Sequence, residues 1–181
     1  MVYTKEMKKE FKNLSIRARI AYAIMCFEEY VLVKYPTINF SKVGVWMWAI
    51  VSTTEPNVDE LAYKYLNIVP ECLYEFDSFE KGYFEDFSKE EYDTFVEIIP
   101  KDDEILNYLM NEICEIVMIH MYTTFSSTDN ESIVELKNIT NKLVEVKIPL
   151  PDISLLAKYN PDLCDGWGCE ISHKGLFKIL I

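Results

Sequence analysis

The chain has 181 residues, of which half are apolar and 14% are aromatic, so it can bury a sizeable core and is too hydrophobic to be intrinsically disordered. Its formal net charge is −12, which disfavours nucleic acid and anionic membrane surfaces as partners and favours a basic protein partner. The same charge would also arise if acidity served only to keep the protein soluble.

The expected location is the cytoplasm. The N-terminal sequence MVYTKEMKKEF lacks the apolar segment of a signal peptide. The most apolar run, residues 113–121, is interrupted by Glu115 and His120 and is too short and too polar to span a membrane. Three of the five cysteines lie in apolar helical stretches and are expected to be small buried residues in a reducing compartment, namely Cys26, Cys72 and Cys114.

The first predicted helix covers residues 14–35, where apolar residues recur at spacings of three and four. Ser15 can cap its start, and Pro36 ends it. Ser41 is a plausible cap for a second helix, which carries two tryptophans. Trp46 shares a helix face with Ile50, whereas Trp48 lies on another face, so either one ring lies in the core and the other is partly exposed, or both rings lie in the core.

Three shorter helices are predicted from their start signals. Asn57 with Glu60 resembles a capping box, Pro70 suits the first turn of a short helix, and Ser88 with Glu91 repeats the capping-box pattern ahead of a helix that ends near residue 99.

A long helix is predicted from Glu104 to about Phe125, capped by Asp102 or Asp103. It is apolar almost all round and is therefore expected to be the central core helix. One more amphipathic helix follows, marked by apolar residues from Ile133 to Leu143.

The sequence predicts an all-α, single-domain bundle of about seven helices. Residues 1–146 form its helical core, and residues 147–181, which contain prolines and glycines, form an irregular tail packed on that core. The final LFKILI is compatible with a short strand or a helix turn. Trp167 lies between Gly166 and Gly168, and its ring is expected to anchor the tail on the helices.

The strongest functional signal is residues 75–93, EFDSFEKGYFEDFSKEEYD, with eight carboxylates, six aromatic residues and two lysines. If the aromatic side chains are exposed, this surface is both apolar and strongly negative and suits a basic protein partner. They could equally fold inward and form a second small core. The candidate anchors are Phe79, Tyr83, Phe84 and Phe87, and the candidate steering charges are Glu80, Glu85, Asp86 and Glu90.

Signals for chemistry are weaker, and we predict no cofactor, metal or catalytic residue. Cys164, Cys169 and His173 are spaced C-x4-C-x3-H, with Asp165 and Glu170 close by, but this matches no standard zinc motif. His120 has no base or nucleophile at a usable spacing on its own helix. The sequence contains no GxSxG, HExxH, GxxxxGK[ST] or GxGxxG motif.

Four segments resemble small, acidic immunity proteins that bacteria encode beside polymorphic toxins: IAYAIMCFEEYV, VGVWMWAIVST, DELAYKYL and PLPDISLL…DGWGCEIS. They cover about a third of the chain. The resemblance implies a cytoplasmic protein that occludes or distorts a cognate toxin by binding it, and it implies no catalytic residues.

The sequence therefore favours a non-enzymatic binding protein with a basic partner such as a toxin domain. Two alternatives stay open. One is a hydrolytic enzyme with a carboxylate-based or Cys/His-based site, in which two carboxylates meet in space. The other is a scaffold subunit of a helical assembly, which would bury a large apolar face on self-association. The sequence does not fix the oligomeric state.

Overall fold

The computed structural model describes residues 4–53, 58–82, 84–85, 87–121, 131–162, 166–172 and 174–179, without the side chain of His120. These residues form eight α-helices, two short 3-10 helices and no strand, which confirms the all-α prediction. The α-helices are α1 (Lys5–Lys12), α2 (Ile16–Lys34), α3 (Ser41–Ser52), α4 (Val58–Leu66), α5 (Pro70–Leu73), α6 (Lys89–Ile98), α7 (Glu104–Met121) and α8 (Glu131–Glu145); the 3-10 helices are η1 (Phe79–Lys81) and η2 (Ile153–Leu156).

Helix α1 was not among the predicted helices. It begins at Thr4, whose hydroxyl oxygen accepts a hydrogen bond from the Met7 amide at 3.2 Å. Its apolar face consists only of Met7 and Phe11, one turn apart, and packs beside α8. Two apolar residues are too few to distinguish an amphipathic helix from a charged terminus, so the periodicity does not reveal it.

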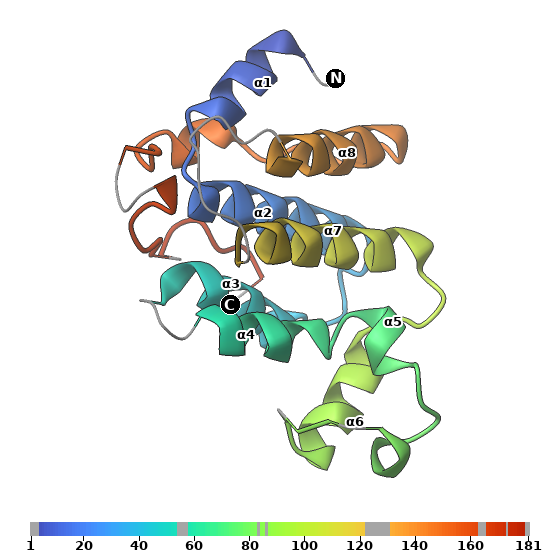
Figure 1. Ribbon diagram of the computed structural model, residues 1–181. Helices are drawn as coiled ribbons and strands as arrows, with labels where there is room; N and C mark the ends of the chain where they lie inside the picture. Colours follow the sequence, from blue (N-terminus) through green and yellow to red (C-terminus); the bar gives the residue numbers. More distant parts are fainter. Residues whose placement is uncertain are drawn as a thin grey trace.

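Helices α2 and α7 lie side by side in the middle of the bundle (Figure 1). Helix α8 packs on both of them from one side, while α3 packs on α2 and α4 on α7 from the other. The expectation that the helix from Glu104 would be the central one is therefore only partly right. Helix α2 is the more completely buried of the two, since every residue from Ile16 to Glu28 is buried.

Several predicted helix starts are confirmed by their hydrogen bonds. Ser15 accepts from the Ala18 amide, Ser88 and Glu91 form both bonds of the capping box, and Asp103 accepts from the amides of residues 105 and 106. Pro70 opens α5 as predicted. The cap of α3 differs, because the Asn39 side chain, and not that of Ser41, accepts from a backbone amide there. Asn57 lies outside the described residues.

The tail after residue 146 contains η2 and is otherwise irregular, as predicted. Its end is fastened to the middle of the bundle by Glu28, whose carboxylate accepts hydrogen bonds from the indole N–H of Trp48 at 2.9 Å and from the backbone N–H of Lys178 at 3.2 Å. Residues 174–179 are neither helix nor strand, so LFKILI, as far as it is described, takes neither expected form.

The two tryptophans of α3 take the first of the two arrangements that the sequence left open. Trp48 is buried, at 2% exposure, and Trp46 is half-buried. Trp167 is half-buried and packs against the core, while its flanking glycines both have positive φ, 93° and 83°. No helix in the described part of the chain has the length and apolar character needed to cross a membrane.

Candidate protein-binding surface

Residues 74–99 form a lobe at the end of the molecule opposite α1 (Figure 1). This segment, here called the acidic lobe, leaves the bundle after α5, bends through η1 and returns along α6. The capping box of Ser88 and Glu91 fixes the start of α6, and Pro100 follows directly after the lobe.

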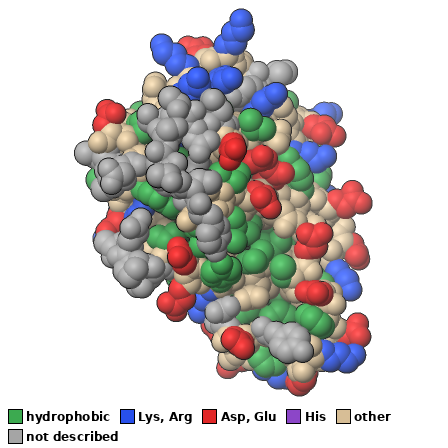
Figure 2. All heavy atoms as spheres, in the orientation of Figure 1, with side chains coloured by type: hydrophobic (Ala, Val, Ile, Leu, Met, Phe, Trp, Pro, Cys, Tyr) green, Lys and Arg blue, Asp and Glu red, His purple; other side chains and the backbone are tan. Residues whose placement is uncertain are grey.

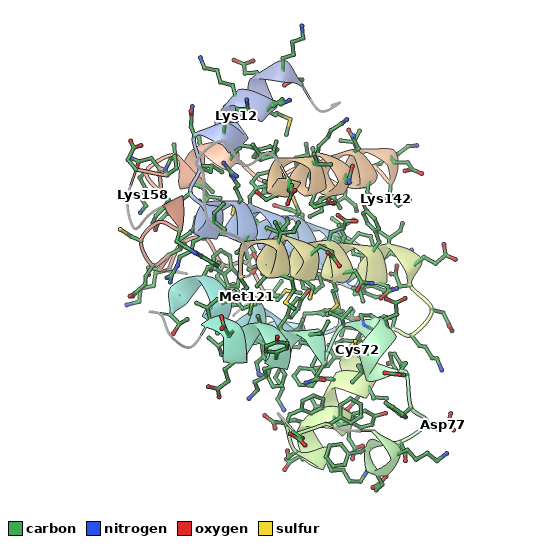
Figure 3. The ribbon with its side chains drawn as sticks, viewed as in Figure 1. Lys12, Cys72, Asp77, Met121, Lys142 and Lys158 are labelled. Carbon is green, nitrogen blue, oxygen red and sulfur yellow. The ribbon has the colours of Figure 1, made fainter. Side chains whose placement is uncertain are left out.

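The described aromatic rings of the lobe face each other. Phe79 and Phe84 stack with ring centroids 5.8 Å apart, and Phe84 contacts Phe87 at 5.2 Å and Tyr92 at 5.0 Å. Figure 3 shows ring side chains filling the interior of the lobe, while Asp77 points away from it. These aromatic residues thus form a second small core, the alternative that the sequence left open.

Trp46 of α3 connects the lobe to the bundle. Its ring lies 4.7 Å from that of Phe95 and 5.6 Å from that of Phe87, and the ammonium of Lys64 lies 4.4 Å from its centroid. The ammonium of Lys42 on α3 donates to the hydroxyl of Thr94 on α6 at 3.3 Å. These contacts give the lobe a defined orientation on α3 and α4.

The described carboxylates of the lobe lie on the outside of this aromatic core. The acidic lobe contains nine carboxylates and two lysines, a net charge of −7 out of −12 for the whole chain. Both lysines pair within the lobe, Lys81 with Asp77 at 2.9 Å and Lys89 with Asp93 at 3.3 Å, but these groups are largely exposed and such pairs contribute little. The hydrogen bond and the charge of Lys81 lower the pKa of Asp77.

The charge is distributed unevenly along the molecule. Helix α1, at the opposite end, exposes four lysines against two glutamates, and Lys12 projects from it in Figure 3. In Figure 2, basic side chains gather at the α1 end, while acidic side chains are spread over the middle of the face and the lobe. A basic partner would therefore be attracted towards the lobe end and repelled from the α1 end.

The structure places six of the eight predicted site residues in this lobe. Glu80, Glu85 and Glu90 are exposed, Phe79 and Phe84 are half-buried, and Phe87 is buried at 6% exposure. Tyr83 and Asp86 lie outside the described residues. Sequence reasoning missed the supporting rings of Trp46 and Phe95. For Phe95 the sequence did carry a signal: Tyr92 and Phe95 stand three residues apart in α6, a spacing that places both rings on one face of the helix.

The cysteine and histidine cluster is only partly described. Cys169 and Glu170 are exposed, whereas Cys164, Asp165 and His173 lie outside the described residues. Within the described residues, no group of three or more His, Cys, Asp or Glu side chains could hold a metal ion.

A second cluster of titratable groups lies between α7 and α8, where the half-buried carboxyls of Glu112 and Glu135 interact. Burial raises the pKa of Glu112, and the neighbouring Glu135 raises it further, while a hydrogen bond with Tyr108 acts against both. Asn138 donates to Glu135 at 3.0 Å. Neither carboxyl was a predicted site residue, since helices α7 and α8 bring them together from positions far apart in the chain.

The chain matches no model of a known protein family, no characterised protein and no solved structure in comparisons of sequence and fold.

Proposed function

We propose that this protein binds a basic protein partner through its acidic lobe. The observation that carries the proposal is the concentration of charge. Residues 74–99 bear −7 of the net −12, and the described carboxylates among them lie on the outside of a small aromatic core that projects from the bundle. A charged projection of this kind steers an oppositely charged protein and sets its orientation on contact.

The half-buried rings would supply the apolar part of the contact. Phe79 and Phe84 stack at the lobe surface with part of each ring still open to solvent, beside the exposed carboxylates of Glu80 and Glu85. Aromatic side chains held in place by their neighbours lose little conformational entropy on binding and slow dissociation. We assign Phe87, which is buried, to the support of these two rings.

We further propose that the partner is a bacterial toxin and that the protein is its immunity protein, acting in the cytoplasm by occluding or distorting the toxin. The support is the resemblance of four segments of the chain to such proteins, including the helix with Trp46 and the DGWG sequence of the tail. A toxin that acts on nucleic acid would itself carry the basic surface that the lobe fits.

The test is to isolate the tagged protein from lysate of its source and to identify bound species by native mass spectrometry. The proposal expects one basic protein at one-to-one stoichiometry that is lost at high salt, and whose toxicity in a sensitive host is abolished when both proteins are produced together. A captured protein without such toxicity would remove the immunity role. Binding that is indifferent to salt would remove the role of the acidic lobe.

An enzymatic function is favoured by one observation, the Glu112–Glu135 pair with the raised pKa of Glu112, because general acids need such a pKa. If these carboxyls are catalytic, replacing both by glutamine should abolish hydrolysis of glycoside or ester substrates while leaving partner binding intact. Equal activity of the wild type and the double variant would exclude this site.

A further inference from the structure

Arg17 lies in the first turn of α2 and is 4% exposed. Three elements surround it. One guanidinium nitrogen of Arg17 lies 3.5 Å from the carbonyl oxygen of Val51, in the last turn of α3. The backbone N–H of Arg17 donates to the carbonyl oxygen of Trp167, in the tail, at 3.0 Å. The tail continues along α3, where the Ile171 amide donates to the same Val51 oxygen at 2.9 Å. Figure 1 shows the tail passing between these two helix ends.

The guanidinium of Arg17 is poorly satisfied for a buried cation. Among the described residues its buried Nε–H has no hydrogen-bond partner, and the bond from another guanidinium nitrogen to the carbonyl oxygen of Val51, at 3.5 Å, is at the limit of hydrogen-bond length. Among the described residues no carboxylate lies within ion-pair distance of it. Buried guanidinium groups in proteins are normally paired with an anion, because an unpaired charge there is costly.

The helix end increases this cost. The N-terminus of an α-helix carries a partial positive charge, and the first turn of α2 has no acidic residue to balance it. Arg19, also buried in this turn, differs from Arg17: its Nε donates to the carbonyl oxygen of Phe11 at 3.1 Å and another nitrogen donates to Ser132 at 3.0 Å. Of these two buried arginines, Arg17 therefore has an Nε–H that lacks an acceptor among the described residues, whereas the Nε–H of Arg19 has one.

We propose that Arg17 binds a small oxyanion, a phosphate or a carboxylate, where the first turn of α2, the last turn of α3 and residues 166–168 meet. The planar guanidinium holds such groups through two parallel N–H···O bonds, and the unused Nε–H supplies one of them. The helix dipole adds to the attraction. Because Arg17 is almost fully covered, the anion enters when the tail at residues 166–168 moves aside.

The first experiment measures thermal unfolding of the full-length protein in sodium phosphate, sodium acetate and sodium chloride at equal ionic strength. A saturable rise in Tm of about 3–6 °C, at ten times the dissociation constant, is expected with the anion that the site prefers. A rise in phosphate alone identifies a phosphate site, and a rise in acetate alone identifies a carboxylate site. Identical curves in all three salts would overturn the proposal.

The variants assign the effect to Arg17. In Arg17→Met the anion-dependent rise should disappear, and the protein in chloride should be at least as stable as the wild type, since an unpaired buried charge has been replaced by an apolar side chain of similar length. The control Lys12→Met, which removes an exposed cation of α1, should keep the full rise. A rise of equal size in Arg17→Met would overturn the assignment. If that variant does not fold, calorimetric titrations of the wild type with phosphate and with acetate decide, and absence of one-to-one binding of both anions overturns the proposal.

Discussion

Trp48 on α3 donates its indole N–H to the carboxylate of Glu28 on α2 across 2.9 Å, and neither residue is more than 2% exposed. The second carboxylate oxygen accepts from the backbone N–H of Lys178, and the Lys178 ammonium pairs with Glu29. One buried carboxyl thus joins the middle helix, its neighbour and the end of the described tail. Its ionisation should therefore affect the stability of the whole fold.

The first prediction concerns pH. Burial raises the pKa of Glu28 to about 7, although the hydrogen bonds from Trp48 and Lys178 act against this rise. The folded protein therefore keeps a proton that the unfolded chain releases near pH 4.5. Stability should fall by up to about 3 kcal/mol as the pH rises from about 4.5 to 7, with no further effect of this group above that range. Urea unfolding at a series of pH values measures this change in the free energy of unfolding.

Two variants distinguish the contribution of Glu28 to this pH dependence from the contributions of other titratable groups. Glu28→Gln removes the ionisation, so its stability should fall less than that of the wild type over this pH range. Trp48→Phe removes the indole hydrogen bond, which favours the ionised form of Glu28. The pKa of Glu28 should therefore rise further, and the loss of stability should continue to a higher pH. Parallel curves for wild type and Glu28→Gln would mean that Glu28 does not titrate as described. The pKa of Asp103 is lowered, because hydrogen bonds from Tyr35 and Tyr30 outweigh the effect of burial. The ionisation of Asp103 therefore affects stability only at a lower pH than that of Glu28.

Gly168→Ala should destabilise the protein by about 2–4 kcal/mol. Gly168 has a φ of 83°, and a Cβ there would overlap the hydroxyl of Ser15, the cap of α2. Gly175→Ala is the matched control, because its φ is 84° but a Cβ there would meet nothing within 4 Å. It should lose only about 1 kcal/mol. Equal losses in chemical denaturation would contradict the close approach of the tail to α2.

Lys147→Gly should stabilise the protein by roughly 0.5–1 kcal/mol. Lys147 has a φ of 62°, and it follows the last turn of α8, where the Ile148 amide donates to the Leu143 carbonyl oxygen at 2.9 Å and the Lys147 amide donates to that of Val144 at 3.1 Å. These are the two bonds of a helix end that normally employs glycine. A lower urea midpoint for this variant would show that the lysine side chain contributes more than its backbone strain costs.

Trp46→Ala should loosen the acidic lobe while leaving the bundle folded. The ring contacts both Phe87 and Phe95, and its loss should lower stability by about 2 kcal/mol. Limited proteolysis should then cut within residues 74–88 faster than in the wild type. Val45→Ala, one residue away and 49% exposed, is the control and should leave cleavage unchanged. Unchanged cleavage of the Trp46 variant would mean that other contacts hold the lobe.

The helix pattern could be predicted where local signals act within one turn. Ser15, Ser88 with Glu91, and Asp103 cap helices as the sequence indicates, because a cap depends only on residues three positions away. The tertiary contacts could not be predicted in this way. Glu28 meets Trp48 and Lys178 at separations of 20 and 150 residues. Their pairing depends on how α2, α3 and the tail pack.

The acidic lobe was likewise predictable only in part from the sequence. The acidic character of residues 75–93 is evident from composition, but the orientation of the rings depends on Trp46, which lies 29 residues before that segment. Alternation of aromatic and acidic residues fits both an exposed and an inward arrangement. The docking of α6 on α3 decides between them, and it buries Phe87 while leaving parts of Phe79 and Phe84 open.

The most direct test of the central claim is partner affinity in two charge-reversed proteins with equal net charge. One carries Glu80→Lys, Glu85→Lys and Glu90→Lys in the acidic lobe; the other carries Glu6→Lys, Asp162→Lys and Glu170→Lys, all exposed and outside it. Surface plasmon resonance against the captured basic partner should give association at least tenfold slower for the lobe variant only, with the difference shrinking as salt is added. Equal rates for the two variants would contradict the assignment of binding to the acidic lobe.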